Sequence, residues 1–158
     1  MATQPTNVDR INKLHIMSGS TLASAKSTLQ SAKQKLTTDQ LASDLRPYAM
    51  VIQTSTACAL LGLAIELSLK LLIECTTGHC ARRIHDLTKL FNDLPQSERD
   101  FLNSTISDCE SFLDTHKTSF EDWRYFHDAD PRNDRQMVDP ETAEKIITAI
   151  SQRRVDVS

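Results

Sequence analysis

Two charged residues interrupt an otherwise apolar stretch of this chain. Between Ala57 and Ile73 almost every residue is apolar or small, and the two that carry charge are Glu66 and Lys70. They stand four residues apart with the acid first, the order and spacing that favour an ion pair on a helix. A charge on a buried helix costs several kcal/mol unless it is paired or used. The pattern therefore predicts a structural ion pair, with Lys70 extending toward the helix end, or two side chains that line a polar cleft.

A histidine beyond this stretch is a candidate for acid–base chemistry. His85 stands at the expected start of the next helix, and an imidazole can donate or accept a proton in catalysis. One interpretation makes it an acid or base in a cleft, and the other makes it a helix-terminal side chain bonded to backbone or to Glu66. Arg82 and Arg83, which precede it, are expected to be solvated and to add positive potential at the same end of the protein.

A second group of candidates follows an aromatic segment. Arg124 comes directly after Trp123, and Tyr125 and His127 follow it. A guanidinium group matches the geometry of phosphate oxygens, so Arg124 is the strongest phosphate-binding candidate in the sequence. The neighbouring aromatic residues are expected to pack in the core or at an interface.

A metal site is a weaker prediction. Cys75, His79, Cys80 and His85 are residue types that bind zinc. Adjacent ligands at 79 and 80, and the absence of a Cys-x2-Cys pair, differ from the usual spacings of zinc sites. We therefore expect no metal and no cofactor.

Several classes of function are disfavoured by the sequence. The chain has no Gly-rich phosphate loop, no Gly-x-Ser-x-Gly motif and no paired-carboxylate signature, so it does not itself carry kinase or nucleotidyltransferase chemistry. The formal net charge is −3 and the sequence pI about 5.9, which excludes a globally basic nucleic-acid binder. A local basic cleft stays compatible with this balance.

The composition and periodicity predict one all-α domain that spans residues 1–158. Three glycines and five prolines are few, as in a helical protein with short connections. Apolar or small residues recur at alternating three- and four-residue spacing from residue 8 to residue 36. No run alternates with the two-residue period of a strand. We expect an up-and-down bundle of five or six helices.

The helix boundaries follow from caps, prolines and glycines. The first helix is expected over 8–36, either unbroken or bent at Gly19, and Pro47 suits the first turn of a central helix over 48–75. Ser97 and Asp100 form a candidate capping box for a helix that ends near His116. The remaining elements are a short helix over 40–44, an amphipathic helix over 84–94, a helix over 120–126, an exposed loop over 128–139 and a C-terminal helix over 140–154.

The sequence also bears on location. Residues 60–73 form the one candidate membrane span, but they are fewer than the usual ~20 residues and contain Glu66 and Lys70, so we interpret them as a buried core helix. No signal peptide is evident. Four cysteines (Cys58, Cys75, Cys80 and Cys109) are expected to be reduced thiols in the cytoplasm.

Three motifs in order resemble the HEPN superfamily of small helical bundles. They are Glu66-x3-Lys70, then His85-Asp86-Leu87-x2-Leu90 after Gly78, and then Phe120-x2-Trp123-Arg124-Tyr125. The resemblance covers residues 48–127. HEPN proteins occur in prokaryotic toxin–antitoxin, phage-defence and nucleotidyltransferase-associated systems, so the resemblance implies a HEPN-like bundle that forms a homodimer.

The same resemblance bears on activity. Many HEPN proteins are metal-independent ribonucleases that place an Arg-x4-6-His motif from each subunit in a shared cleft. In this chain Arg124 and His127 give the shorter Arg-x2-His, and the one literal match, Arg10 to His15, lies in the first helix. With ten Arg and five His, about one such match is expected by chance, so we give it little weight.

Two functions of different classes follow. The first is a non-catalytic, dimeric module that binds RNA, a nucleotide or a partner protein from a neighbouring gene, such as a nucleotidyltransferase or an antitoxin. The alternative is an endoribonuclease toxin in which Arg124 binds phosphate and His127 or His85 transfers protons.

Overall fold

The computed structural model describes residues 6–37, 46–81, 83–124 and 136–157. For residues 35–37, 46–50, 124 and 154–157 the description is limited to the backbone. The described ranges contain seven helices and no strand. The predicted all-α bundle is therefore confirmed, with one helix more than expected.

The helices differ widely in length. The three long ones are α1 (Asn7–Thr37), α2 (Arg46–Thr77) and α7 (Pro140–Val157). The four short ones are α3 (Leu87–Asn92), α4 (Gln96–Thr105), α5 (Cys109–Thr115) and α6 (Ser119–Arg124). The predicted helix over 40–44 lies outside the described residues.

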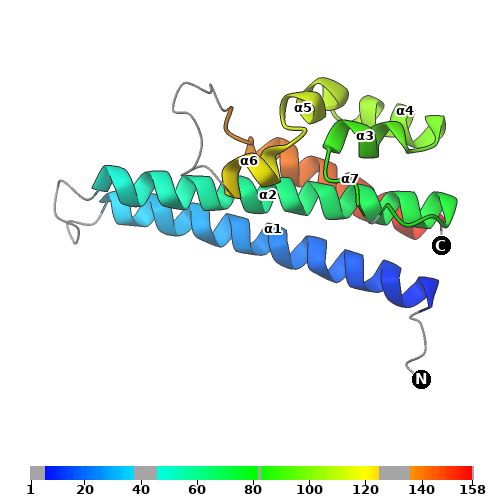
Figure 1. Cartoon of the computed structure of the whole chain (residues 1–158), viewed down its shortest axis with the longest axis horizontal. Coiled ribbons are helices and arrows are strands. Elements are labelled where there is room, and N and C mark those ends of the chain that lie inside the picture. The colour runs from blue at the N-terminus through cyan, green and yellow to red at the C-terminus, as the bar shows by residue number, and fades with distance from the viewer. Residues whose placement is uncertain (1–5, 38–45, 82, 125–135, 158) are drawn as a thin grey trace.

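The long helices α1 and α2 form an antiparallel hairpin along the length of the molecule (Figure 1). The predicted 8–36 pattern is one continuous helix, without a break at Gly19. Its inward face carries the small residues Ser18, Ala25 and Ala32, which are buried against α2. Small side chains let the two helix backbones approach closely but bury little apolar area, so polar contacts add to what holds α1 in place.

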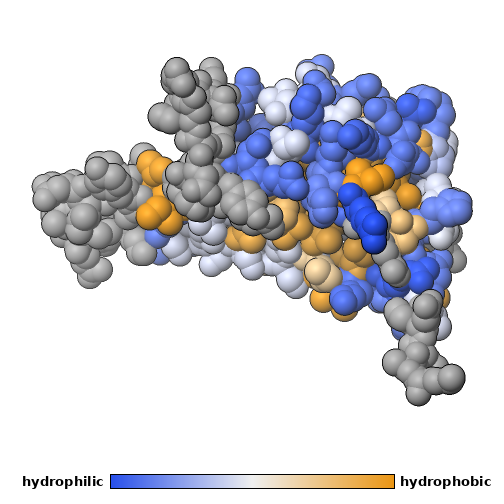
Figure 2. Space-filling model, in the orientation of Figure 1, coloured by the Kyte–Doolittle hydropathy of each residue, from blue (hydrophilic) through white to orange (hydrophobic). Residues whose placement is uncertain are grey.

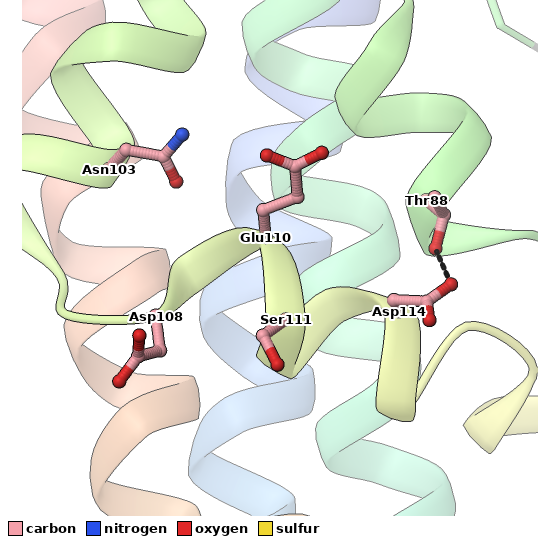
Figure 3. Close-up of a pocket in the computed structure, with 6 residues that line it drawn as sticks. All are labelled: Thr88, Asn103, Asp108, Glu110, Ser111 and Asp114. Carbon is pink, nitrogen blue, oxygen red and sulfur yellow. Dashed lines mark hydrogen bonds between the residues drawn. The ribbon is translucent and has the colours of Figure 1, made fainter.

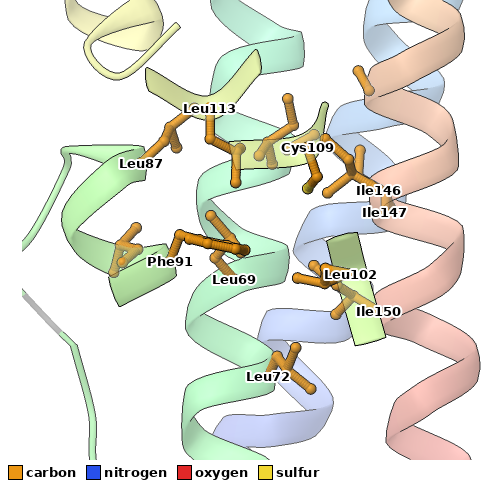
Figure 4. Close-up of a cluster of buried hydrophobic side chains, with 14 of the residues drawn as sticks. Leu69, Leu72, Leu87, Phe91, Leu102, Cys109, Leu113, Ile146, Ile147 and Ile150 are labelled. Carbon is orange, nitrogen blue, oxygen red and sulfur yellow. The ribbon is translucent and has the colours of Figure 1, made fainter. Parts of the chain in front are cut away.

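The main core lies over the C-terminal half of α2. Leu69 and Leu72 of α2 meet side chains from α3, α4, α5 and α7 there (Figure 4). The labelled members from those four helices are Leu87, Phe91, Leu102, Cys109, Leu113, Ile146, Ile147 and Ile150. Helix α2 is thus surrounded on several sides, which explains why its sequence is apolar around most of its circumference.

The central helix predicted over 48–75 is present as Arg46–Thr77. Within the described chain, one helical segment, Val51–Thr77, has the length and composition to cross a membrane, and most of it is buried inside the bundle. At 27 residues it is longer than the stretch 60–73 considered from the sequence, and its burial agrees with the interpretation as a core helix. A core helix of a soluble bundle meets the same criterion.

Two predicted boundaries are wrong. Helix α4 begins at Gln96 after Pro95, and Ser97 lies inside the helix without capping it. The predicted single helix up to His116 is two helices, α4 and α5, because the chain turns at Asp108, whose backbone is left-handed (φ 57°). Asp tolerates this conformation better than most residues, and this turn accounts for the seventh helix.

The start of the amphipathic segment also differs from the prediction. The predicted helix over 84–94 is confined to Leu87–Asn92, and Asp86 caps it by accepting a hydrogen bond from the Lys89 N–H at 3.1 Å. His85 therefore lies in the loop just before the cap and is not helical.

The C-terminal helix begins as predicted. The Asp139 carboxylate accepts hydrogen bonds from the Thr142 N–H at 2.9 Å and the Thr142 hydroxyl at 2.6 Å, the arrangement of an N-cap. Of the predicted exposed loop, 128–135 lies outside the described residues. Val138, within the described remainder, is buried in the core.

Helix α6 packs directly on α2 at a glycine. A Cβ at Gly62 would lie 2.9 Å from the backbone nitrogen of Phe120, so the start of α6 touches the α2 backbone. Trp123, one turn further along α6, is half-buried against the core. The aromatic residues of this segment that the structure describes therefore contribute to packing within the chain.

Candidate functional site

Three charged residues form a row along the C-terminal half of α2. Glu66, Lys70 and Glu74 are spaced four residues apart and so follow one face of the helix. The Glu66 and Glu74 side chains are 3% and 1% exposed, and that of Lys70 is 11% exposed. The Lys70 ammonium donates to Glu66 Oε1 at 2.6 Å, so the predicted ion pair is present and nearly buried.

The loop after α2 brings His85 to this row. Helix α2 ends at Thr77, and Gly78 after it adopts a positive φ of 71° that L side chains disfavour, so the chain turns back. His85 Nδ1 lies 3.0 Å from Glu66 Oε1, the same oxygen that Lys70 contacts. Because an ionised carboxylate only accepts hydrogen bonds, Nδ1 is the donor in this contact. The His85 ring is half-exposed.

The antiparallel hairpin brings the first turns of α1 to the other end of the row. Arg10 Nε donates to Glu74 Oε1 at 2.8 Å. Further along the contact between α1 and α2, which we call the seam, the Ser18 and Ser68 hydroxyls are 2.6 Å apart and buried. We call Glu66, Lys70, Glu74, His85 and Arg10 the charged cluster. It joins α1, α2 and the loop before α3 at one end of the hairpin.

A pocket of about 610 Å³ opens beside the charged cluster. It lies between the first turns of α1 and the last turns of α2, and Cys80 from the loop also lines it. Its polar side includes Arg10, Lys13, Lys70 and Glu74, and its apolar side consists of Leu14, Met17 and Leu67. The volume falls within the range of small-molecule binding sites, roughly 300–1,000 Å³.

The buried carboxylates are incompletely hydrogen-bonded. Glu66 Oε2 and Glu74 Oε2 are buried, and neither has a partner among the described residues. A buried oxygen without a hydrogen bond costs about 1–3 kcal/mol, more when it is charged. Of these two residues Glu74 lines the pocket, so its Oε2 is the hydrogen-bond acceptor left unused there.

The structure describes little of the second group of predicted site residues, Arg124, Tyr125 and His127. Arg124 is the last residue of α6, with only its backbone described, and Tyr125 and His127 lie outside the described residues. The hypothesis that Arg124 and His127 converge with His85 stays a prediction. Arg83 is exposed, as expected, and Arg82 lies outside the described residues.

The weak zinc prediction gains no support from the described residues. They contain no group of three or more His, Cys, Asp or Glu side chains that could hold a metal ion. Cys80 and His79 are exposed, Cys75 is half-buried, and His85 is bonded to Glu66. None of the four cysteines forms a disulfide bond with another described residue.

A second surface pocket, of about 620 Å³, is less suited to a site. It is lined by Thr88, Asn103, Asp108, Glu110, Ser111 and Asp114. Figure 3 shows that its three carboxylates point in different directions, and the one hydrogen bond drawn runs from Thr88 to Asp114. Exposed acids that do not converge present no coordination geometry, so we assign the candidate site to the charged cluster.

Sequence reasoning missed part of this site. Glu74 continues the four-residue spacing of Glu66 and Lys70, and this signal was present in the sequence. Arg10 was considered only as half of an Arg-x4-His match, and in the structure it contacts Glu74 while His15 is exposed. Five residues correspond to about 140° around a helix beyond one full turn, so the two side chains do not share a site.

The arrangement is chemically suited to binding anions and holding a histidine in a fixed orientation. Comparisons with protein-family models, with curated proteins and with solved structures gave no match to this chain. The functional argument therefore rests on the cluster and on the motif resemblance.

Proposed function

We propose that this chain is a HEPN-like helical bundle that acts in the cytoplasm as a dimeric, non-catalytic RNA- or nucleotide-binding module of a defence, stress or toxin–antitoxin type system. The observation that carries the proposal is the charged cluster with its pocket. Lys13 and Lys70 stand beside apolar residues there, and Arg83 is exposed on the loop that leads to His85. Lysine and arginine are the usual phosphate partners in nucleic-acid binding.

The motif order supports the family assignment. The Glu66–Lys70 pair and His85 contact one another in space, as expected if the "E-x-x-x-K" and "H-D-L" elements serve one site. The overall negative charge of the chain favours local over general binding of polyanions.

Fluorescence anisotropy with a labelled single-stranded RNA tests the proposal. We expect saturable binding that weakens with salt, together with intact RNA on a gel and a dimer by light scattering. Lys13→Ala and Arg83→Ala should each weaken binding several-fold, as expected from loss of one phosphate contact. Lys33→Ala, an exposed lysine on the far part of α1, is the matched control.

Absence of RNA and nucleotide binding would reject this function. Co-purification of a stable partner protein under the same conditions would then favour a protein-binding module in its place. A monomer at micromolar concentration would reject the dimer.

A ribonuclease is the second candidate, and one specific contact favours it. Glu66 holds His85 through Nδ1, which leaves Nε2 of the half-exposed ring as the acceptor of a proton. A histidine oriented by a carboxylate is a common general base. In this hypothesis the base takes the proton of a ribose 2′-hydroxyl, whose oxygen attacks the phosphorus to form a 2′,3′-cyclic phosphate and breaks the bond to the 5′-oxygen. The leaving 5′-oxygen takes a proton from the protonated histidine or from water, and Arg124 binds the phosphate.

Incubation of purified protein with RNA and chelator separates the two candidates. If the protein is a ribonuclease, His85→Gln, Arg124→Ala or His127→Ala should reduce the cleavage rate at least about 100-fold. Cleavage that all three variants retain would identify a contaminating nuclease, and no cleavage by the wild type would reject catalysis.

A further inference from the structure

The pocket beside the charged cluster has the chemistry of a specific ligand site. We infer that it binds a terminal phosphate monoester that carries an apolar or aromatic body, held between Lys13 and Lys70 with the body against Leu14, Met17 and Leu67. This inference rests on the proposed function, in which the chain binds RNA or a nucleotide. It adds the position of a binding site and the chemical class of its ligand.

The volume and lining of the pocket indicate the size of the ligand and require that part of it be apolar. Its volume of about 610 Å³ accommodates a small organic molecule. The side chains of Met17 and Leu67 form part of its apolar side, and Met17 is 42% exposed. Figure 2 shows apolar surface along the junction of α1 and α2. A purely polar anion would leave this side unfilled.

The charges of the pocket favour an anion. Glu74 is paired with Arg10, and Glu66 with Lys70, so these four charges form two neutral pairs. Lys13 remains, and its ammonium has no ion-pair partner among the described side chains. Asp9 also lines the pocket, and its hydrogen bonds with Thr6 hold the pKa of its carboxyl below the ordinary value, so it adds a negative charge. The lining cations Arg10, Lys13 and Lys70 still outnumber the lining acids Asp9 and Glu74.

The ammonium groups of Lys13 and Lys70 are the two donors that favour a phosphate ligand. A lysine ammonium has three N–H groups, and Lys70 directs one of them at Glu66 Oε1. The other two, with those of Lys13, suit the several oxygens of a phosphate group better than the two of a carboxylate.

The unused carboxylate oxygen adds a second requirement. Glu74 lines the pocket, and its Oε2 is buried without a partner. A carboxylate oxygen can only accept a hydrogen bond, so a ligand that satisfies this oxygen must offer an O–H or N–H next to its anionic group. A phosphate monoester meets both requirements in its singly charged form, because one of its oxygens then carries a proton. A carboxylate ion offers no such donor.

Phenyl phosphate is a suitable probe because it joins a phosphate monoester to a flat apolar ring. Calorimetric titration of the full chain should show saturable one-site binding, whereas inorganic phosphate and benzoate should bind at least about tenfold more weakly. Met17→Glu places a like charge in the pocket and should weaken phenyl phosphate binding at least about tenfold, and Lys13→Ala should weaken it several-fold. Both side chains are exposed, so these variants are expected to fold.

Two matched controls come from the same helix. Ile16→Glu adds the same charge at the neighbouring residue, which is 65% exposed and does not line the pocket. Lys33→Ala removes a lysine far along α1. Both should bind phenyl phosphate as the wild type does.

The Cys80 thiol gives an independent readout. It is exposed and lines the pocket, so bound phenyl phosphate should slow its alkylation by iodoacetamide. No saturable binding up to on the order of 10 mM would overturn the inference. So would equal binding by Met17→Glu and Ile16→Glu, or benzoate binding as tightly as phenyl phosphate.

Competition distinguishes the two sources of the phosphate. Displacement of phenyl phosphate by a 5′-phosphorylated RNA, but not by the same RNA with a 5′-hydroxyl, assigns the pocket to an RNA end. Displacement by neither RNA assigns it to a small metabolite. Because RNA binding is measured separately by anisotropy, loss of the proposed function and loss of this pocket give different results.

Discussion

Arg10 and Glu74, 64 residues apart in the sequence, form an ion pair in which Arg10 Nε lies 2.8 Å from Glu74 Oε1. The Glu74 side chain is 1% exposed and that of Arg10 is 29% exposed, so the acid is buried and the base is partly solvated. Further along the seam, the buried Ser18–Ser68 contact repeats the same antiparallel register. Small side chains such as Ala25 and Ala32 only weakly determine the register of α1 along α2. The two polar contacts fix this register.

Removal of Arg10 should therefore destabilise the protein. In Arg10→Ala the buried Glu74 carboxylate loses its paired cation, and we expect the free energy of unfolding to fall by about 1–3 kcal/mol, below the cost for a fully buried pair because Arg10 is partly solvated. Urea denaturation followed by circular dichroism measures this change.

Lys13→Ala is the control for the loss of a nearby cation, because its exposed ammonium has no ion-pair partner among the described residues. It should change stability by less than about 0.5 kcal/mol. If the double variant Arg10→Met, Glu74→Leu were as unstable as Arg10→Ala, the unpaired charge would not be the cause of the loss.

Gly62 should tolerate no side chain. The Cβ of Gly62→Ala would lie 2.9 Å from the Phe120 backbone nitrogen and 3.1 Å from Ser119 Cβ, so α6 would have to move. Such overpacking costs about 1–3 kcal/mol. Gly19→Ala is the matched control, since nothing lies within 4 Å of its added Cβ and a helical alanine gains about 0.5–1 kcal/mol over glycine. Equal stability of the two variants in urea would contradict the close contact of α6 with α2.

The thiols should differ sharply in reactivity. Burial raises the pKa of the Cys109 thiol to about 11, and burial also raises that of Cys58. Because the thiolate is the nucleophile, both should resist iodoacetamide at about pH 8 while the exposed Cys80 reacts first. Peptide mass spectrometry after timed alkylation measures this order. Labelling of Cys109 as fast as Cys80 in folded protein would contradict its burial.

The sequence predicted the elements better than their ends. The long helices α1 and α2 were confirmed because many residues contribute to each pattern, a three- and four-residue period in α1 and a long apolar stretch in α2. The α4–α5 boundary was wrong because it depends on one residue, Asp108, whose left-handed backbone no hydrophobic pattern reveals. Ser97 had the residue type of a cap, but the N-cap is Pro95, two residues earlier, and the helix begins at Gln96.

The site was predicted in part for a similar reason. The contact between Glu66 and Lys70 is local, so its spacing alone predicts it. The Glu66–His85 contact was an open alternative, because it depends on the turn at Gly78. The Arg10–Glu74 contact joins two helices, and its existence depends on the register of the hairpin, which the weak Ala/Ser seam of α1 does not specify. Long-range pairs of this kind need the tertiary structure.

A buried histidine should make the stability of the protein depend on pH near neutrality. His116 is 5% exposed and packs on the Phe112 ring, and burial lowers its pKa below the ordinary value of 6.5, while the charge of Asp139 acts in the opposite direction. Below about pH 6.5 the unfolded chain therefore binds a proton that the folded chain does not, so stability is fully present above that pH and falls as the pH decreases, by at most about 1.4 kcal/mol per pH unit. The lowered pKa of the Asp139 carboxyl affects stability only below its ordinary value of 3.8, outside this pH range.

Urea denaturation at about pH 7.5 and about pH 5.5 tests this prediction. The free energy of unfolding should fall less between the two pH values in His116→Gln than in the wild type, because an amide does not titrate. An equal loss in both proteins would assign the pH dependence to other groups.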